Sequence, residues 1–261
     1  TAPEVYRQLG AELTVIANRP DGININSGCG STHPEELMAF VKANKLDLGV
    51  AFDGDADRML AVDENGNLVD GDKIIAICAA QMKQDGKLAK NTAVVTVMSN
   101  MGFFKFCEEN DIKCAKTAVG DRYVLERMLQ KGYNIGGEQS GHVIFLDYAT
   151  TGDGELSAVK LIETVVKSGA TLGSLAKIMT VYPQVLINVP VTPQGKLKYN
   201  NDEYIISAVQ EAEMDLNGDG RVLVRVSGTE PLVRVMLEGK NIEQITKLGN
   251  EIAEVVKERL S

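Results

Sequence analysis

The sequence has no tryptophan, only two histidines, and aromatic residues make up just 5% of its 261 residues. Its longest wholly apolar run, residues 74–80, is far shorter than the roughly 18 residues that a membrane-spanning helix needs. Basic residues are also scarce, with 27 Lys and Arg against 36 Asp and Glu, a net charge of −9. These shortages argue against a membrane protein and against general nucleic-acid binding. The hydrophobic share of 44% is nevertheless ample for a globular core.

Cysteine is also sparse, and Cys29, Cys78, Cys107 and Cys114 form no C-x-x-C pair. No charged and apolar stretch of a signal peptide stands near the start. The pattern predicts a reducing compartment, and therefore the cytoplasm. Because the sequence opens on Thr1 with half a helix pattern, we expect a fragment or a processed chain.

Hydrophobic periodicity predicts alternating strands and helices. Residues 13–17 and 48–52 are expected strands, a helix over 33–45 lies between them, and 59–62 and 68–69 form a hairpin around Asn65-Gly66. The further expected strands are 93–98, 113–117 and 133–136, and the further helices are 72–83, 103–110, 121–131, 155–167 and 172–179. The prediction is an α/β fold with a parallel or mixed sheet covered on both faces.

After residue 181 the pattern changes to a smaller βαββα unit of the α+β class. Its expected elements are strand 185–191, a polar stretch 194–202, helix 203–216, strands 222–226 and 232–237, and helix 242–260. We predict three domains, over residues 1–68, 69–181 and 182–261.

Three alternating aspartates, Asp53, Asp55 and Asp57, follow an expected apolar strand. Such carboxylates repel one another unless a cation joins them, so they predict a hard divalent ion, Mg²⁺ or Ca²⁺. A solvated acidic turn is the alternative. An EF-hand is disfavoured because Arg58 stands where the loop needs glycine and strands flank the loop. A phosphatase of the haloacid dehalogenase type, with Asp53 as nucleophile, is a weaker alternative because Asp57 replaces the expected Thr or Val.

The glycine-rich stretch 136–142 carries Glu138, Ser140 and His142. Glycines let the backbone turn closely round a ligand, and short polar side chains supply donors and acceptors that match sugar hydroxyls. The stretch predicts a sugar-binding loop. The alternative is an ordinary polar loop with a hydrogen-bonded histidine.

The stretch 225–231 ends an expected strand and precedes Arg234 in the next one. Arginines, hydroxyls and a glycine that frees backbone N–H groups suit a phosphate. Asp121 and Arg122, at the start of an expected helix, would add a cation and N-terminal amides to the same anion. The alternatives are a hairpin turn with surface arginines and an ordinary helix start. The predicted phosphate cradle consists of Arg225, Ser227, Gly228, Thr229 and Arg234.

Four ordered motifs resemble the α-D-phosphohexomutase superfamily, and most closely its branch that acts on glucosamine phosphates. They are Asp-Gly-Asp-Ala-Asp-Arg at 53–58, Thr-Ala-Val-Gly-Asp-Arg-Tyr-Val at 117–124, Gly-Glu-Gln-Ser-Gly-His at 137–142 and Arg-Val-Ser-Gly-Thr-Glu-Pro at 225–231. The sequence departs from the family pattern at Ala56, where glycine is common, and at Val226, where proline is common. Without the rigid φ of proline, Val226 predicts a looser phosphate loop.

The resemblance implies an intact enzyme that interconverts glucosamine 6-phosphate and glucosamine 1-phosphate through a phosphoserine and a bisphosphate intermediate, in amino-sugar metabolism. It implies Mg²⁺ on the three aspartates, Arg58, Lys116 and His142 as catalytic residues, and Glu138 and Ser140 on the sugar. The phosphoserine loop of the family is absent from these 261 residues. The expected role of this chain alone is therefore Mg²⁺ and sugar-phosphate binding without turnover, with a homodimer as its expected partner state. Phosphomannomutase or phosphoglucomutase activity is the alternative.

Overall fold

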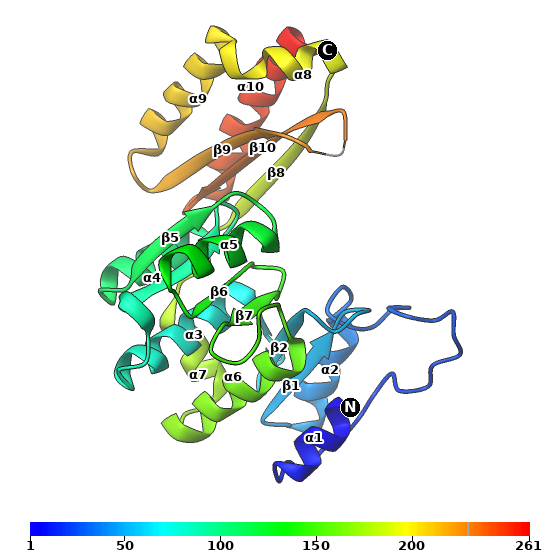
Figure 1. Cartoon of the computed structure of the whole chain (residues 1–261). Coiled ribbons are helices and arrows are strands. Elements are labelled where there is room, and N and C mark those ends of the chain that lie inside the picture. The colour runs from blue at the N-terminus through cyan, green and yellow to red at the C-terminus, as the bar shows by residue number, and fades with distance from the viewer. Residues whose placement is uncertain (229) are drawn as a thin grey trace. The chain divides into compact units, whose positions relative to one another are not determined.

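A computed structural model describes residues 1–228 and 230–261, with Asn200 described by its backbone alone. The chain divides into two compact units (Figure 1), the first of residues 1–99 and 103–180 and the second of residues 100–102 and 181–261. Among the described residues, none of the helices combines the length and hydropathy that crossing a membrane requires.

The first unit begins with helix α1 (Ala2–Gln8) and contains two sheets. In the smaller one, β1 (Leu48–Phe52) pairs antiparallel with β2 (Met59–Asp63), which pairs antiparallel with β3 (Leu68–Val69). Helix α2 (Glu35–Asn44) packs closely on β1, since a Cβ atom at Gly49 would lie 2.6 Å from the side chain of Val41. The hairpin prediction is confirmed, and Gly66 supplies the positive φ of +83° in its turn.

The larger sheet has the strand order β5-β4-β6-β7. Strand β4 (Thr92–Thr96) pairs in parallel with β5 (Lys113–Thr117) and β6 (Ile135–Gly137), and β7 (Val143–Phe145) is antiparallel to β6. Ala93 and Val95 of β4 face the main core, whereas Val94 faces a smaller cluster. The sheet is therefore mixed and covered on both faces, as predicted.

The helices over this sheet fall into two groups. The main core takes in apolar residues of α3 (Gly71–Gln84), α4 (Met101–Glu109) and α6 (Gly154–Ser168), and the smaller cluster those of α5 (Asp121–Lys131). Asp70 and Asp153 cap α3 and α6 by accepting hydrogen bonds from Lys73 N and Leu156 N. Helix α7 (Leu172–Leu175) and the 3-10 helices Ala89–Asn91 and Ala176–Ile178 complete the unit.

In the second unit, β8 (Gln184–Pro190) and β9 (Gly220–Val226) both pair antiparallel with the central strand β10 (Leu232–Gly239). Helices α9 (Glu203–Leu216) and α10 (Ile242–Leu260) cover one face of this sheet (Figure 1). Val233, Val235 and Leu237 of β10 point into the core beneath them. Arg234, Met236 and Glu238 alternate with these residues, so they lie on the opposite face.

Three expectations about local structure were wrong. Residues 13–17 form no strand, because Ala17 has a left-handed φ of +52° that ends any extended run, so no βαβ unit precedes β1. The polar stretch 194–202 contains helix α8 (Pro193–Lys198) and the 3-10 helix Tyr199–Asn201; Thr192 caps α8 by accepting a hydrogen bond from Gly195 N. Strand β7 was missed because its three residues are all buried and show no alternation.

Candidate functional site

The three aspartates lie in the loop between β1 and β2, and each offers a carboxylate oxygen within 4.8 Å of the others. The loop is a tight turn in which Ala56 N donates to Asp53 O at 3.3 Å and Arg58 N donates to Asp53 Oδ1 at 3.1 Å. Ala56 has a φ of +60°, the conformation that favours glycine, which explains why glycine is common there in the resembled family.

Two neighbouring segments hold this aspartate loop in place. Gly154 N, at the start of α6, donates to Ala56 O at 2.9 Å, and a Cβ atom on Gly154 would lie 2.8 Å from that same oxygen. An isolated β-bridge joins Arg58 to His142, and Met59 N donates to Gly141 O at 3.0 Å. The loop conformation is therefore set by backbone contacts and not only by its own sequence.

The donor set fits a hard cation. All three candidate ligands are carboxylates, the group that Mg²⁺ and Ca²⁺ prefer. Asp57 Oδ1 is buried and accepts no hydrogen bond from the described residues. Burial also raises the pKa of the Asp57 carboxyl, an effect reinforced by Asp53 and Asp55 and opposed by His142 and Arg58. A divalent cation would satisfy this oxygen and offset the repulsion.

The predicted sugar loop is held in place by contacts with the start of α3 and with the residues before α5. Gly71 N donates to Gln139 O at 3.0 Å, and a Cβ atom at Gly71 would lie 2.1 Å from Glu138 O. Gln139 Nε2 donates to Asp70 Oδ2 at 3.2 Å, so this side chain supports the loop. Glu138 Oε1 accepts a hydrogen bond from Gly120 N at 3.0 Å, which ties the sugar loop to the residues before α5. Ser140 is exposed at the tip.

His142 stands between two carboxylates. Its Nε2 lies 3.4 Å from Asp57 Oδ2 and 3.8 Å from Asp121 Oδ2. The ring is 3% exposed, and neither nitrogen has a hydrogen-bond partner among the described residues. A Cβ atom at Gly152 would lie 2.4 Å from Nε2, so the glycine leaves room for the ring. The structure thus brings together the aspartate loop, His142 and Asp121.

Two predicted residues are placed elsewhere in the first unit. Lys116 Nζ lies 3.9 Å from the centroid of the Phe104 ring and makes no ion pair with a described residue. Arg122, whose side chain is 81% exposed, pairs with Glu126 one turn along α5 at 2.8 Å. Among the described residues, neither side chain forms an ion pair with Asp57 or Asp121.

In the second unit, Arg225 and Arg234 are direct cross-strand neighbours on β9 and β10. Burial lowers the pKa of the Arg225 guanidinium, and the charge of Arg234 lowers it further. Arg234 donates to Glu230 Oε2 at 2.7 Å, but its buried Nε has no partner among the described residues. Two adjacent like charges, one with an unused donor, form a site that an anion would stabilise.

Asn188 belongs to the same row and was missed from the sequence. It lies opposite Arg234 on β8 and is exposed. The sequence feature that could have identified it is alternation along the strand. Asn188 lies on the same face of β8 as Leu186, opposite the core-facing residues. We call Asn188, Arg234 and Arg225 the arginine row.

The loop beside the arginine row is only partly as predicted. Ser227 is buried, and its Oγ accepts a hydrogen bond from Glu230 N at 3.2 Å. Gly228 has no positive φ and open space around its Cα, so the backbone does not require glycine there. Thr229, also predicted for the cradle, lies outside the described residues.

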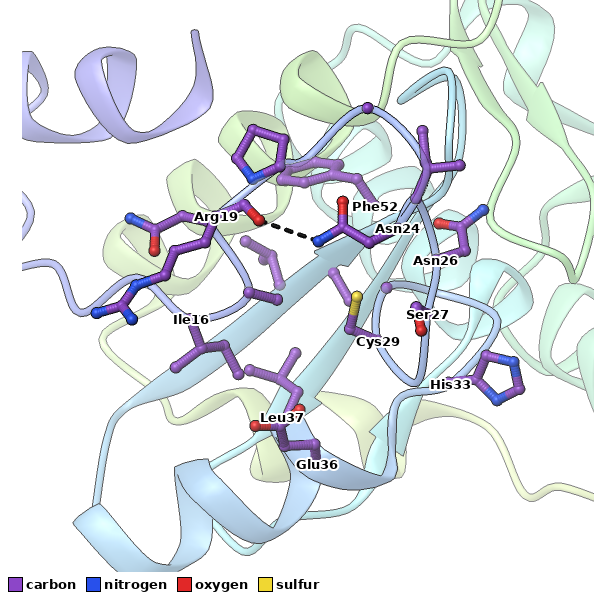
Figure 2. A pocket seen from close by; sticks show the side chains of 18 residues that line it. Ile16, Arg19, Asn24, Asn26, Ser27, Cys29, His33, Glu36, Leu37 and Phe52 are labelled. Carbon is purple, nitrogen blue, oxygen red and sulfur yellow. Dashed lines mark hydrogen bonds between the residues drawn. The ribbon is translucent and has the colours of Figure 1, made fainter.

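A cavity of about 770 Å³ lies beside β1 and α2. Figure 2 shows that the segment with Ile16, Arg19 and Asn24 lines part of it. Asn24 Nδ2 donates to Arg19 O at 3.0 Å across this segment. None of the predicted site residues lines the cavity.

Comparison with known families matches nearly the whole chain. Residues 1–66, 70–182 and 186–255 match, in turn, alpha/beta/alpha domain II, alpha/beta/alpha domain III and the C-terminal domain of phosphoglucomutase/phosphomannomutase. The chain belongs to this family. The recognition made from the four motifs is therefore confirmed.

Curated relatives share more than half of the residues. The phosphoglucosamine mutase of Caldicellulosiruptor bescii is 55% identical over 260 residues, and that of Clostridium acetobutylicum is 56% identical over 259. These alignments cover 100% and 99% of this chain but 58% of each relative, so the chain spans about 58% of their length.

Solved structures share the fold at low identity. Aspergillus fumigatus N-acetylphosphoglucosamine mutase gives a TM-score of 0.80 at 21% identity, over 99% of this chain and 59% of that one. The same fungal enzyme in complex with GlcNAc-6P and magnesium gives a TM-score of 0.74 at 21% identity, over 100% of this chain and 59% of that one. The predicted fold class, α/β domains followed by a smaller α+β unit, is confirmed.

Proposed function

We propose that this chain carries the metal-, sugar- and phosphate-recognition residues of a phosphoglucosamine mutase, which interconverts glucosamine 6-phosphate and glucosamine 1-phosphate. The observation that carries the proposal is the convergence of three carboxylates beside His142, in a loop joined by backbone contacts to the sugar loop. The named relatives at 55% and 56% identity support this choice of reaction.

Asp53, Asp55 and Asp57 would hold Mg²⁺ when it is present. A bound Mg²⁺ would withdraw charge from a phosphoryl group during its transfer. Arg58, whose Nε lies 3.6 Å from Asp53 Oδ2 and whose side chain is 48% exposed, would bind the oxygens of that phosphoryl group. His142, between Asp57 and Asp121, would move a proton to or from the reacting hydroxyl.

Sugar and phosphate recognition would fall on different residues. Glu138 and Ser140 would bind ring hydroxyls, with Asp121, Arg122 and Lys116 as further contributors. In the second unit the arginine row, with Ser227, Gly228 and Thr229, would bind the phosphate that is not reacting. Asn188 joins this proposal as a neutral donor beside Arg234.

The chain alone is proposed to bind without turnover, because its 261 residues contain no phosphoserine loop. The domain boundaries at 68 and 181, the homodimer and the cytoplasmic location stay predictions. A preference for glucosamine over glucose or mannose phosphate is also part of the proposal. The Gln139 side chain does not support that preference, since it bonds to Asp70.

The test compares Arg225→Ala with Glu138→Ala in NMR titrations with glucosamine and glucosamine 6-phosphate in the presence of Mg²⁺. Loss of an arginine–phosphate hydrogen bond should weaken binding of the phosphate ligand alone by about ten- to a hundredfold, from roughly 1.5–3 kcal/mol. Glu138→Ala should weaken both ligands equally. An Arg225→Ala chain that keeps the wild-type preference for the phosphorylated sugar would refute the phosphate assignment. Tighter binding of mannose 6-phosphate than of glucosamine 6-phosphate by the wild-type chain would refute the proposed sugar preference.

A further inference from the structure

The turn that carries Glu138 and Ser140 is closed by its own backbone. Gly141 N donates to Glu138 O at 3.0 Å, and Glu138 N donates to His142 O at 3.0 Å. Gln139 and Ser140 are therefore the two central residues of a four-residue turn. Ser140 is exposed, whereas Gln139 is half-buried. These two adjacent residues thus have different surroundings.

Gln139 joins this turn to the start of α3 by two hydrogen bonds. Its carbonyl oxygen accepts from Gly71 N at 3.0 Å, and its Nε2 donates to Asp70 Oδ2 at 3.2 Å. Gly71 is the first residue of α3, and its N–H is one of the four that a helix leaves without an internal partner. Asp70 Oδ1 accepts from Lys73 N at 3.1 Å and caps the helix. One carboxylate therefore binds both the helix start and the turn.

Helix α3 gives the turn a buried support. Ile74, Ile75 and Ala76, in its first two turns, have no exposed surface. The turn lies directly against the helix start, since a Cβ atom at Gly71 would lie 2.1 Å from Glu138 O. A binding loop that is already fixed in this way loses less conformational freedom when its ligand binds.

We propose that Gln139 is a positioning residue for sugar binding, and that it acts through Asp70. The pair holds the turn on α3 so that Glu138 and Ser140, on either side of Gln139, are presented to one ligand, while the Gln139 amide does not contact the sugar. This inference rests on the sugar-binding role proposed above for Glu138 and Ser140. It also adds Asp70, which lies outside the four motifs, to the residues that determine sugar affinity.

The first test removes the side chain that makes the bond. In NMR titrations, Gln139→Ala should weaken binding of both glucosamine and glucosamine 6-phosphate by about threefold to tenfold, the worth of one hydrogen bond that orders the turn. The matched control is Gln81→Ala, because Gln81 Nε2 donates to Asp85 Oδ1 at 2.8 Å at the other end of α3. The control should bind like wild type. Wild-type affinity in Gln139→Ala would overturn the proposal.

A swap of the two polar groups separates positioning from direct contact. Gln139→Glu sets two carboxylates against each other, and Asp70→Asn sets two amides against each other, so each should weaken sugar binding. The double variant Asp70→Asn/Gln139→Glu reverses donor and acceptor and should restore affinity to within about twofold of wild type. Wild-type binding in Asp70→Asn, with weak binding in the double variant, would show that Gln139 contacts the sugar and would overturn the proposal.

Amide hydrogen exchange without any ligand makes the test independent of the proposed function. The N–H groups of Gly71 and Gly141 should exchange faster in Gln139→Ala and return to the wild-type rate in the double variant, because local opening of the turn becomes easier when the bond is lost. A wild-type chain that binds neither ligand would refute the proposed sugar function, whereas unchanged exchange in Gln139→Ala would overturn the positioning role.

Discussion

In the second unit, the face of the sheet opposite α9 and α10 carries two polar rows that cross the same three strands. One row consists of Gln184, Glu238 and Arg221, and the other is the arginine row of Asn188, Arg234 and Arg225. Leu186, Met236 and Leu223 separate them. Both rows place an amide on β8 and an arginine on β9, and the central residue on β10 has opposite charge in the two rows.

That single difference decides what each row can do. Glu238 is fully buried, lies 2.6 Å from Arg221 Nε, and accepts hydrogen bonds from Asn100 Nδ2, Met101 N and Gln184 Nε2. Arg221 thus balances the charge of Glu238, and both carboxylate oxygens accept hydrogen bonds. Arg234, in the same position of the other row, repeats the charge of its neighbour. The first row has matched charges, whereas the second carries two arginines against one exposed carboxylate, Glu230, and is the proposed phosphate site.

The largest expected effect is on the stability of the matched row. Glu238→Ala removes a fully buried carboxylate, its ion pair with Arg221 and the acceptor of three further hydrogen bonds, and should lower the unfolding free energy of the second unit by about 3–5 kcal/mol. Arg225→Ala removes one of two like charges and should change it by less than about 0.5 kcal/mol. Urea unfolding of both variants measures the contrast. Equal losses of unfolding free energy in the two variants would mean that both rows serve to stabilise the unit.

Converting the arginine row toward the matched one should abolish its proposed function. Asn188→Asp places a carboxylate beside Arg234, stabilises the sheet by about 0.2–1 kcal/mol and should weaken phosphate binding at least tenfold. Asn188→Ala, the control at the same position, removes only a neutral donor, worth about 1 kcal/mol, and should weaken binding by less than tenfold. Phosphate titrations followed by NMR give both values. Unchanged binding in Asn188→Asp would remove Asn188 from the site.

The two rows should also differ in their response to pH. Burial raises the pKa of Glu238 above its usual value, although Arg221 and Met101 N oppose the shift. The folded state then holds a proton at pH values where the unfolded chain has lost it, so this contribution to stability is present at low pH and lost as pH rises through the folded-state pKa. The unfolding free energy should therefore fall with rising pH in this range, by at most about 1.4 kcal/mol per pH unit.

Glu238→Gln should remove that slope, and the difference between wild type and variant isolates it from other groups. Thermal or urea unfolding between the usual glutamate pKa and neutrality measures the difference. Arg225→Lys, in the arginine row, should leave the slope as in wild type. A wild-type slope that survives in Glu238→Gln would show that other carboxyl groups cause it.

The smallest effect concerns the carboxylate that competes for Arg234. Glu230 pairs with it at 2.7 Å through an exposed side chain, an interaction worth less than about 1 kcal/mol. Glu230→Gln should therefore tighten phosphate binding by about threefold. Glu251→Gln, which breaks an exposed pair with Lys247 on α10, is the control and should change nothing. Weaker binding in Glu230→Gln would show that Glu230 orients Arg234 for the ligand.

Much of the architecture follows from short-range rules that the sequence displays. Helices α9 and α10 and strand β1 have the bounds that periodicity predicts, because their apolar residues recur at the spacing of a face that packs on a neighbour. Residues 13–17 have an equally apolar pattern, yet Ala17 turns left-handed. A short apolar run becomes a strand only where another strand pairs with it.

The residues of the candidate site could be predicted in part from the sequence, but the contacts that position them could not. Residue type and spacing indicated the three aspartates, and the structure brings their oxygens together. Nothing in the local sequence could show that Gly71 and Gly154 let the site loops approach, or that Asn188 would stand opposite Arg234. These are properties of register and of backbone contact between distant segments. The pairing of Lys116 with Phe104 likewise depends on how α4 packs on β5.

The β-bridge between Arg58 and His142 couples the aspartate loop to the sugar loop through backbone pairing. A ligand that orders one of them therefore lowers the entropy that the other must still lose. If a cation binds the aspartates and a sugar binds Glu138, each raises the affinity of the other by the same factor, because coupling free energies are reciprocal. The free concentration of magnesium in the cell would then set the apparent affinity for the sugar, with no direct contact between the two ligands.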